Sequence, residues 1–268
     1  MIDRMTKLQT FARAGWFARG VVYCLLGVLA LTGTGASDAS PQGVFRSVQD
    51  MPGGPWLLGL LALGLALYGA YRLYSAAFDS EDKGDDTKGA AIRIGYAASG
   101  LAHFFLAYAA ARLALGKQSS GDGGTEQRAA DMVLDIPLGE ALIGALGLAF
   151  LAAAAHQAIK AWTTEFMADT GPGAPRWVVP IGRAGLVARA VVFAVIGLSL
   201  VSAGWFGSAG EVKGLGDALS SLADHPELYA LVGVGLFLFG VHSFVDARWR
   251  RVRNDDVVNV LKSRARAR

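Results

Sequence analysis

The sequence predicts an all-α, polytopic membrane protein with six transmembrane helices arranged as three parallel two-helix repeats. Three observations predict this fold class. The 268-residue chain is 53% hydrophobic and only 18% charged, and it contains 35 glycines, a composition typical of membrane proteins. The charged residues gather in clusters that long apolar stretches separate. A thirteen-residue phrase, "FARAGWFARGVVY" at 11–23, returns as "IGRAGLVARAVVF" at 181–193.

Six apolar stretches are long enough to cross a bilayer. Each has about 20 to 25 residues, which at ~1.5 Å per residue covers about 30 Å of hydrocarbon. Because a backbone in lipid must satisfy its own hydrogen bonds, we predict that all six are helices. The first contains arginines and lacks a cleavage site, so we expect it to be retained. The predicted spans are Ala12–Leu31, Trp56–Phe78, Ile92–Leu115, Leu138–Trp162, Gly182–Ala203 and Leu228–Trp249.

The distribution of lysine and arginine predicts the orientation of these spans. Of the 25 such residues, twenty lie in the N-terminal segment, the loops after the second and fourth spans, and the tail, whereas the other three loops hold five. The positive-inside rule therefore predicts that both termini lie in the cytoplasm. All six tryptophans lie near predicted helix ends, as expected for side chains at the two membrane interfaces.

The repeated phrase divides the chain into three units of similar construction. A weaker copy, "IRIGYAASGLAHF", lies between the two strong ones, and the even-numbered spans also resemble one another. We predict repeats at residues 8–80, 88–165 and 178–253, followed by a basic cytoplasmic tail at 254–268. Each copy of the phrase has an arginine, a glycine two residues later, and a third position four residues after the glycine that is arginine in two of the copies. These residues are Arg13, Gly15 and Arg19 in repeat 1, Arg93, Gly95 and Ser99 in repeat 2, and Arg183, Gly185 and Arg189 in repeat 3.

A short segment precedes each even-numbered span. The three segments read "GVFRSVQDMP", "RAADMVLDIP" and "GDALSSLADHP", each with a few apolar residues near helical spacing and a final proline. We expect a short amphipathic helix at the outer surface, with the proline opening the next span. Because each unit has two spans, every copy enters the membrane from the same side. Such parallel repeats predict a pseudo-threefold axis along the membrane normal.

The phrase "ARAGWFARGVVY", its copies and the even-numbered spans resemble the bacterial family known as domain of unknown function 1206. The resemblance runs from about Leu8 to Arg253, and repeat 2 departs from the pattern at Ser99 and His103. It implies an integral inner-membrane protein made of three tandem two-helix units. It implies no reaction.

His103 is a candidate functional residue because it lies near mid-membrane in the third span. An ionisable group at that depth is costly and usually serves a purpose. The alternative is a neutral imidazole that fills an aromatic slot, since its counterparts in the other repeats are Tyr23 and Phe193.

A second group of candidates is expected at the cytoplasmic end of the spans. If the repeats surround one axis, these side chains converge on a basic ring that favours an anion, such as a lipid phosphate or a carboxylate. The alternative is that the arginines reach out to lipid headgroups and mark topology. The candidate ligand-binding residues are Arg19, Arg189, Arg72, Tyr71, His156 and His242.

Two further patterns carry simpler interpretations. His242 and Asp246 lie four residues apart on one helix face, which fits a histidine oriented by a carboxylate or an Asp246–Arg250 pair at the helix end. The stretch "DSEDKGDD" at 79–86 is predicted to be a solvated loop. With one cysteine and no metal-ligand motif, no metal, cofactor or catalytic residue is expected.

Three functions remain open at the level of sequence. We favour a non-enzymatic membrane scaffold or accessory protein, because no catalytic motif occurs. A transporter or channel for a small solute or anion, with a path between the repeats, is the first alternative. A lipid-acting enzyme that uses His156 and His242 is the second. Anionic lipid headgroups at the cytoplasmic face are the expected partners of the basic tail, a protein partner is a further candidate, and no nucleic acid is expected.

Overall fold

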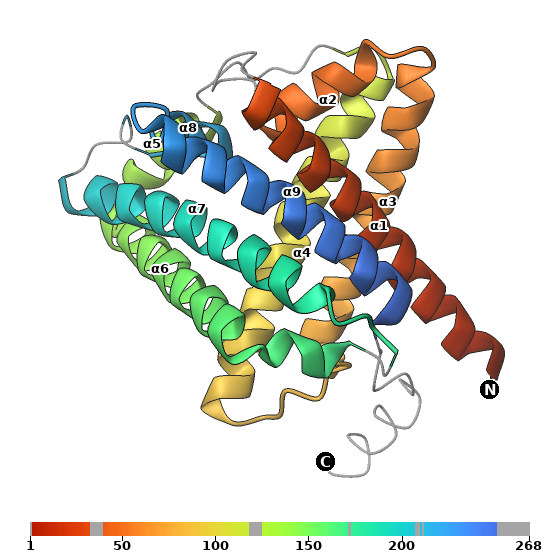
Figure 1. Ribbon diagram of the computed structural model, residues 1–268. Helices are drawn as coiled ribbons and strands as arrows, with labels where there is room; N and C mark the ends of the chain where they lie inside the picture. Colours follow the sequence, from red (N-terminus) through yellow and green to blue (C-terminus); the bar gives the residue numbers. More distant parts are fainter. Residues whose placement is uncertain are drawn as a thin grey trace.

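The computed structural model describes residues 2–32, 40–117, 125–170, 173–206, 210 and 212–250, without the side chains of residues 2–8 and 125–129. Apart from one isolated bridge, the secondary structure of these residues is helical (Figure 1). Six of the helices are long and apolar enough to span a membrane, and each covers nearly all of one predicted span. The all-α, six-span prediction is therefore confirmed. These helices are α1 (Ile2–Thr32), α3 (Gly54–Phe78), α4 (Thr87–Ala114), α6 (Gly139–Thr163), α7 (Val178–Phe206) and α9 (Pro226–Trp249).

The three expected short helices are present and lie together at one end of the bundle. They are α2 (Pro41–Gln49), α5 (Thr125–Leu134) and α8 (Leu215–Ser220), each directly before an even-numbered span (Figure 1). The opposite end, which we call the terminal face, is where α1 begins and α9 ends. It also carries the α3–α4 connection and the 3₁₀ helix η1 (Glu165–Asp169). All three repeats therefore run in the same direction, as predicted.

Local capping explains where these helices begin. Ser40 caps α2, because its hydroxyl oxygen accepts a hydrogen bond of 3.0 Å from the Gly43 amide. The proline that ends each short segment opens its span only at Pro226, the first residue of α9, although a later proline, Pro55, lies in the first turn of α3. Pro52 and Pro137 instead lie before residues with positive φ, Gly53 (77°) and Leu138 (68°), which cap α3 and α6.

The long helices pack side by side in the order α4, α3, α1, α9, α7, α6. Helices of successive repeats pack together (α3 with α4, α6 with α7), and α9 packs on α1, which brings the third repeat back to the first. Within a repeat, α1 packs on α3 and α7 on α9, but α4 and α6 do not form a packed pair in the described part of the chain. The helices therefore form an open ring.

The pseudo-threefold axis is not confirmed, because repeat 2 differs from the other two. About half of the side chains in the α1, α3, α7 and α9 spans are buried (44–50%), whereas the figures for α4 and α6 are 17% and 22%. Repeats 1 and 3 do match closely. A methyl group at Gly64 would collide with Ala18, as one at Gly235 would with Ala188. Small residues thus let the two helices of each of these hairpins approach closely.

The first arginine of the repeated phrase has a structural role in two repeats. The Arg93 Nε donates to the carbonyl oxygen of Ala76 at 2.8 Å, and the Arg183 Nε donates to that of Ala161 at 3.2 Å. Ala76 and Ala161 lie near the ends of α3 and α6, where carbonyl groups lack helical partners. Each arginine therefore caps the preceding repeat's last helix and holds consecutive repeats together.

One tryptophan contradicts the expectation of an interfacial position. Trp16 is 1% exposed and packs edge-on against Tyr71, with ring centroids 5.0 Å apart. The expectation was wrong because the face of α1 that carries Trp16 packs against α3 and the end of α9. Trp56, Trp162 and Trp205 fit the expectation, since each is at least 73% exposed at a helix end.

Candidate functional site

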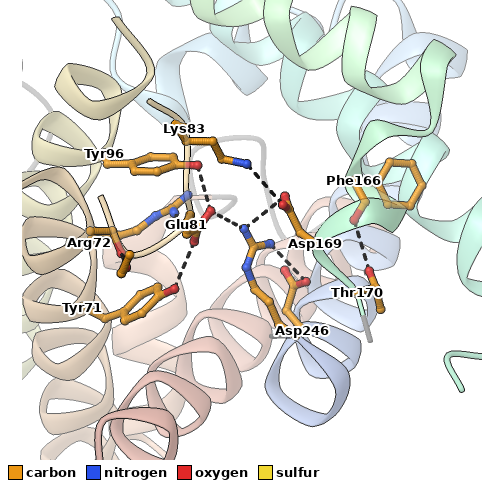
Figure 2. Close-up of polar contacts among 12 residues, drawn as sticks. Tyr71, Arg72, Glu81, Lys83, Tyr96, Phe166, Asp169, Thr170 and Asp246 are labelled. Atoms are coloured by element: carbon orange, nitrogen blue, oxygen red, sulfur yellow. Dashed lines mark hydrogen bonds and ion pairs between the residues drawn. The ribbon is translucent and has the colours of Figure 1, made fainter. Parts of the chain in front are cut away.

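A cluster of buried charges lies just inside the terminal face. We call it the ion cluster, and it consists of Arg19, Glu81, Asp169, Asp246 and Arg250. Its members come from α1, the α3–α4 connection, η1 and the end of α9, so repeats 1 and 3 and the two connections between repeats contribute. Each residue is at most 9% exposed. Figure 2 shows the carboxylates of Glu81, Asp169 and Asp246 converging from three sides.

Glu81 enters the cluster because the chain turns back sharply after α3. Asp79 ends that helix with a positive φ of 51°, and its carboxylate accepts hydrogen bonds of 2.8 Å from the amides of Lys83 and Gly84. Ser80 is fully buried against Ser75, with the two hydroxyl oxygens 2.8 Å apart. The prediction that residues 79–86 form a solvated loop is therefore wrong at Ser80 and Glu81, since the turn places both inside the protein.

Three side chains besides Arg250 hold the Glu81 carboxylate. Tyr71 and Tyr96 donate hydrogen bonds to it at 3.1 and 2.8 Å, and Arg72 binds it at 3.2 Å. Burial alone would raise the pKa of Glu81, but the adjacent guanidinium groups of Arg250 and Arg72 outweigh burial and hold that pKa well below its usual range. Glu81 is therefore ionised at neutral pH.

Asp169 is fixed at the end of η1. Lys83 and Lys160 each bind its carboxylate at 3.2 Å, from the α3–α4 connection and from α6. The next residue, Thr170, pairs through its backbone with Arg250. Burial would raise the pKa of Asp169, but Arg250, Lys160 and Lys83 outweigh it and lower the pKa. The connection after repeat 2 is thereby tied to the connection after repeat 1.

Asp246 connects the cluster to Arg19 in the first span. Arg19 binds the Asp246 carboxylate at 3.0 Å, and it donates to the hydroxyl oxygens of Tyr68 at 2.6 Å and Ser243 at 3.1 Å. The Nδ1 of His242 lies 3.6 Å from an Asp246 oxygen, beyond hydrogen-bond distance. Arg19 thus does not extend to lipid headgroups, because α3 and α9 supply each of its three nitrogens with an acceptor.

Arg250 lies at the centre of the ion cluster. It binds Glu81 at 2.8 Å, Asp169 at 3.3 Å and Asp246 at 3.4 Å, and its guanidinium also covers the ring of Trp16 at 5.4 Å. Burial would lower the pKa of Arg250, but the three carboxylates outweigh it and raise the pKa further above its usual value. The predicted Asp246–Arg250 pair is confirmed, and it belongs to a larger network than a simple helix cap.

Farther from the terminal face than the ion cluster, arginines and aromatic rings alternate across the bundle. Arg72 and Arg19 both lie against the ring of Tyr68, at 5.6 and 4.9 Å, and Arg19 and Arg189 both lie against the ring of Phe239, at 5.0 and 4.5 Å. We call this row the arginine stack. Such contacts are cation–π interactions, which strengthen when the groups are removed from water.

The structure brings most of the predicted site residues together. Arg19, Arg72 and Arg189 lie in the arginine stack, Tyr71 touches Glu81, and His242 packs between Phe166 and Phe239 with ring centroids 5.1 and 6.4 Å away. The expected ring is not purely basic, because three carboxylates enter it. His156 is exposed on α6. It contacts none of the described members of the ion cluster, since α6 is not packed as its counterparts are.

His103 occupies the aromatic slot that its counterparts suggest. Its ring packs against Tyr68 with centroids 4.4 Å apart, and its Nδ1 lies 2.7 Å from the carbonyl oxygen of Ser99. The residues that the sequence did not single out are Tyr68, Glu81, Tyr96 and Asp169. The acidic stretch was the signal for Glu81, but nothing local shows that its chain turns inward. No group of three possible metal ligands occurs among the described residues.

Comparison with known proteins identifies the family. A model titled "Domain of Unknown Function (DUF1206)" matches residues 14–79, 94–164 and 184–250. The chain belongs to this family. This DUF1206 chain is also similar to an uncharacterized protein of Bacillus subtilis (strain 168), YxxB, with 34% identity over 257 residues, which cover 91% of this chain and 92% of the relative. No solved structure matches it.

Proposed function

We propose that this multi-pass membrane protein is a non-enzymatic scaffold whose three hairpins are fastened together at the terminal face. The observation that supports this most directly is Arg250, which binds carboxylates from the α3–α4 connection, η1 and α9. Each acid of the ion cluster also binds at least one other cation. Glu81 binds Arg72 and Asp246 binds Arg19. Asp169 binds both Lys83 and Lys160. A network whose charges all have partners suits a fixed structure better than a reaction centre.

The lipid-acting enzyme finds no support in the histidines. His242 is 4% exposed and packed between aromatic rings, whereas His156 is exposed on another helix. A pair of general acid–base groups must lie within reach of one substrate. We therefore do not propose catalysis by these residues.

A transporter is the second candidate, and one observation favours it. The ring of helices is open between α4 and α6, and ion pairs at a bundle end can exchange partners when helices rock. The two candidates predict different motions. A scaffold keeps one arrangement of the terminal face, whereas a transporter populates at least two.

Distance measurements between two spin labels test the proposal. Lys88 on α4 and Arg248 on α9 are exposed at this face, and they are replaced by cysteine in a Cys24→Ser background. In lipid nanodiscs we expect one narrow distance distribution that an imposed change of anion or pH does not alter. Two populations, together with anion flux in proteoliposomes that Arg250→Ala changes, would replace the scaffold with the transporter.

We also propose that the terminal face is cytoplasmic and that its basic residues contact anionic lipid headgroups. The bias of lysine and arginine toward this end supports the orientation, and each such residue near an anionic surface contributes about 1 kcal/mol to membrane attraction. The basic tail at 254–268 lies outside the described residues. Labelling of Lys88→Cys by a membrane-impermeant maleimide in intact cells tests the orientation. We expect no labelling, and rapid labelling would show that the terminal face lies outside the cell.

A further inference from the structure

Arg189 is the member of the arginine stack whose charge is not matched. Arg19 pairs with Asp246 and Arg72 with Glu81, but Arg189 has no carboxylate partner in the described part of the chain. Its guanidinium lies among the rings of Tyr23, Phe193 and Phe239, at 5.7, 4.8 and 4.5 Å. Its Nε is buried without a hydrogen-bond acceptor.

The alignment of the repeats explains why Arg189 lacks the partners that Arg19 has. Tyr68, which accepts a hydrogen bond from Arg19, corresponds to Phe239, because each precedes a matching glycine in "LALYG" and "LFLFG". Asp246, four residues after His242, corresponds to Lys160, four residues after His156. At the first position phenylalanine stands in place of tyrosine, so the hydroxyl is missing. At the second position a lysine stands in place of an aspartate, so a cation replaces a carboxylate. The missing partners are therefore a feature of the sequence.

An arginine in this position needs an anion. Arg189 is the twelfth residue of α7, which at ~1.5 Å per residue places it about 16 Å from the start of that helix. Aromatic faces supply about 0.5–2 kcal/mol, whereas an uncompensated charge removed from water costs several kcal/mol. The rings alone do not offset that cost.

We propose that Arg189 binds a phosphate group inside the bundle, with the rings of Tyr23, Phe193 and Phe239 as its walls. The planar guanidinium presents paired N–H donors that match phosphate oxygens. The bilayer around the bundle supplies phosphate on its lipids, and the aqueous phase supplies it free. The side on which α4 and α6 are not packed is where a lipid would approach, since these are the least buried spans. This site shares the Phe239 ring with Arg19 of the ion cluster, but it does not rest on the scaffold proposal.

Binding to the purified full chain in phosphatidylcholine nanodiscs tests the proposal. One arm adds dioleoyl phosphatidic acid and counts bound lipid by native mass spectrometry, and the other titrates inorganic phosphate by calorimetry. We expect saturable binding of one molecule in at least one arm. Binding in the first arm alone identifies a lipid headgroup, and binding in the second identifies a free anion. Absence of saturable binding in both arms overturns the proposal.

Two substitutions and one control locate the site. Arg189→Gln is expected to weaken binding by about tenfold or more, the loss of a hydrogen bond to a charged group. Arg176→Gln removes the same charge from an exposed position just before α7 and should leave binding within twofold. Phe239→Tyr gives Arg189 the hydroxyl that Arg19 has in Tyr68, so it should weaken binding several-fold. If Arg189→Gln does not fold, the test uses Phe239→Tyr instead. Unchanged binding in whichever of these variants folds refutes the proposed site.

Discussion

Replacing Arg250 with alanine is the most direct measure of what the ion cluster contributes to stability. Removing one partner of a buried ion pair costs about 3–5 kcal/mol when the other charge is left uncompensated. Here each acid keeps another cation, since Glu81 retains Arg72 at 3.2 Å and Asp246 retains Arg19 at 3.0 Å. We therefore expect a loss near the lower end of that range, about 3 kcal/mol, which includes the lost contact with Trp16.

The assay is unfolding of the purified protein by titration with sodium dodecyl sulfate, followed by circular dichroism. Arg248→Ala is the matched control, because Arg248 is an exposed arginine at the end of the same helix. It should change the free energy of unfolding by no more than about 0.5 kcal/mol. Arg250→Lys should fall between the two, because an ammonium keeps the charge but cannot fork between carboxylates. If Arg250→Ala and Arg248→Ala have equal free energies of unfolding, the conclusion that Arg250 stabilises the bundle is refuted.

Two further perturbations test the acid side of the cluster and the packing of the first hairpin. Because the pKa of Glu81 lies below its unfolded value, its stabilising contribution is complete above about pH 5 and is lost as the pH falls below about 4. Glu81→Gln should be less stable than the wild type at pH 7 and lose less stability on acidification, and parallel pH profiles would contradict this. Gly64→Ala should lose about 1–3 kcal/mol through collision with Ala18, whereas Gly59→Ala, with open space on the same helix, should gain up to about 1 kcal/mol by its helix propensity.

Much of the fold was readable from the sequence because its determinants are local. The length of an apolar run sets each span, and the repetition of the thirteen-residue phrase sets the number of hairpins and their common direction. The short helices α2, α5 and α8 were predictable for the same reason. The departure of repeat 2 from the symmetry was not, since Ser99 in place of an arginine shows that the repeat has changed without showing how α4 and α6 pack.

The candidate site was predictable in part. Aligning the repeats places Arg19, Tyr71 and His242 at one level, and the structure brings these residues into one region. The alignment failed for His156 because level along a helix does not determine which side of the helix is covered. Glu81 and Asp169 were missed because both enter through turns after a helix end, and the buried position of a turn depends on tertiary contacts.

Arg250 lies close to the end of the last hairpin, and this has a consequence for how the protein is made. At ~5–20 residues per second, the ribosome takes roughly 10–30 s to extend the chain from Glu81 to Arg250. During that interval the chain after each of the first two hairpins already carries an acid, Glu81 or Asp169, that Arg250 later binds. Final closure of the bundle therefore waits for the last span, so a chain cut short at Trp249 would contain all six helices and still lack the residue that fastens them.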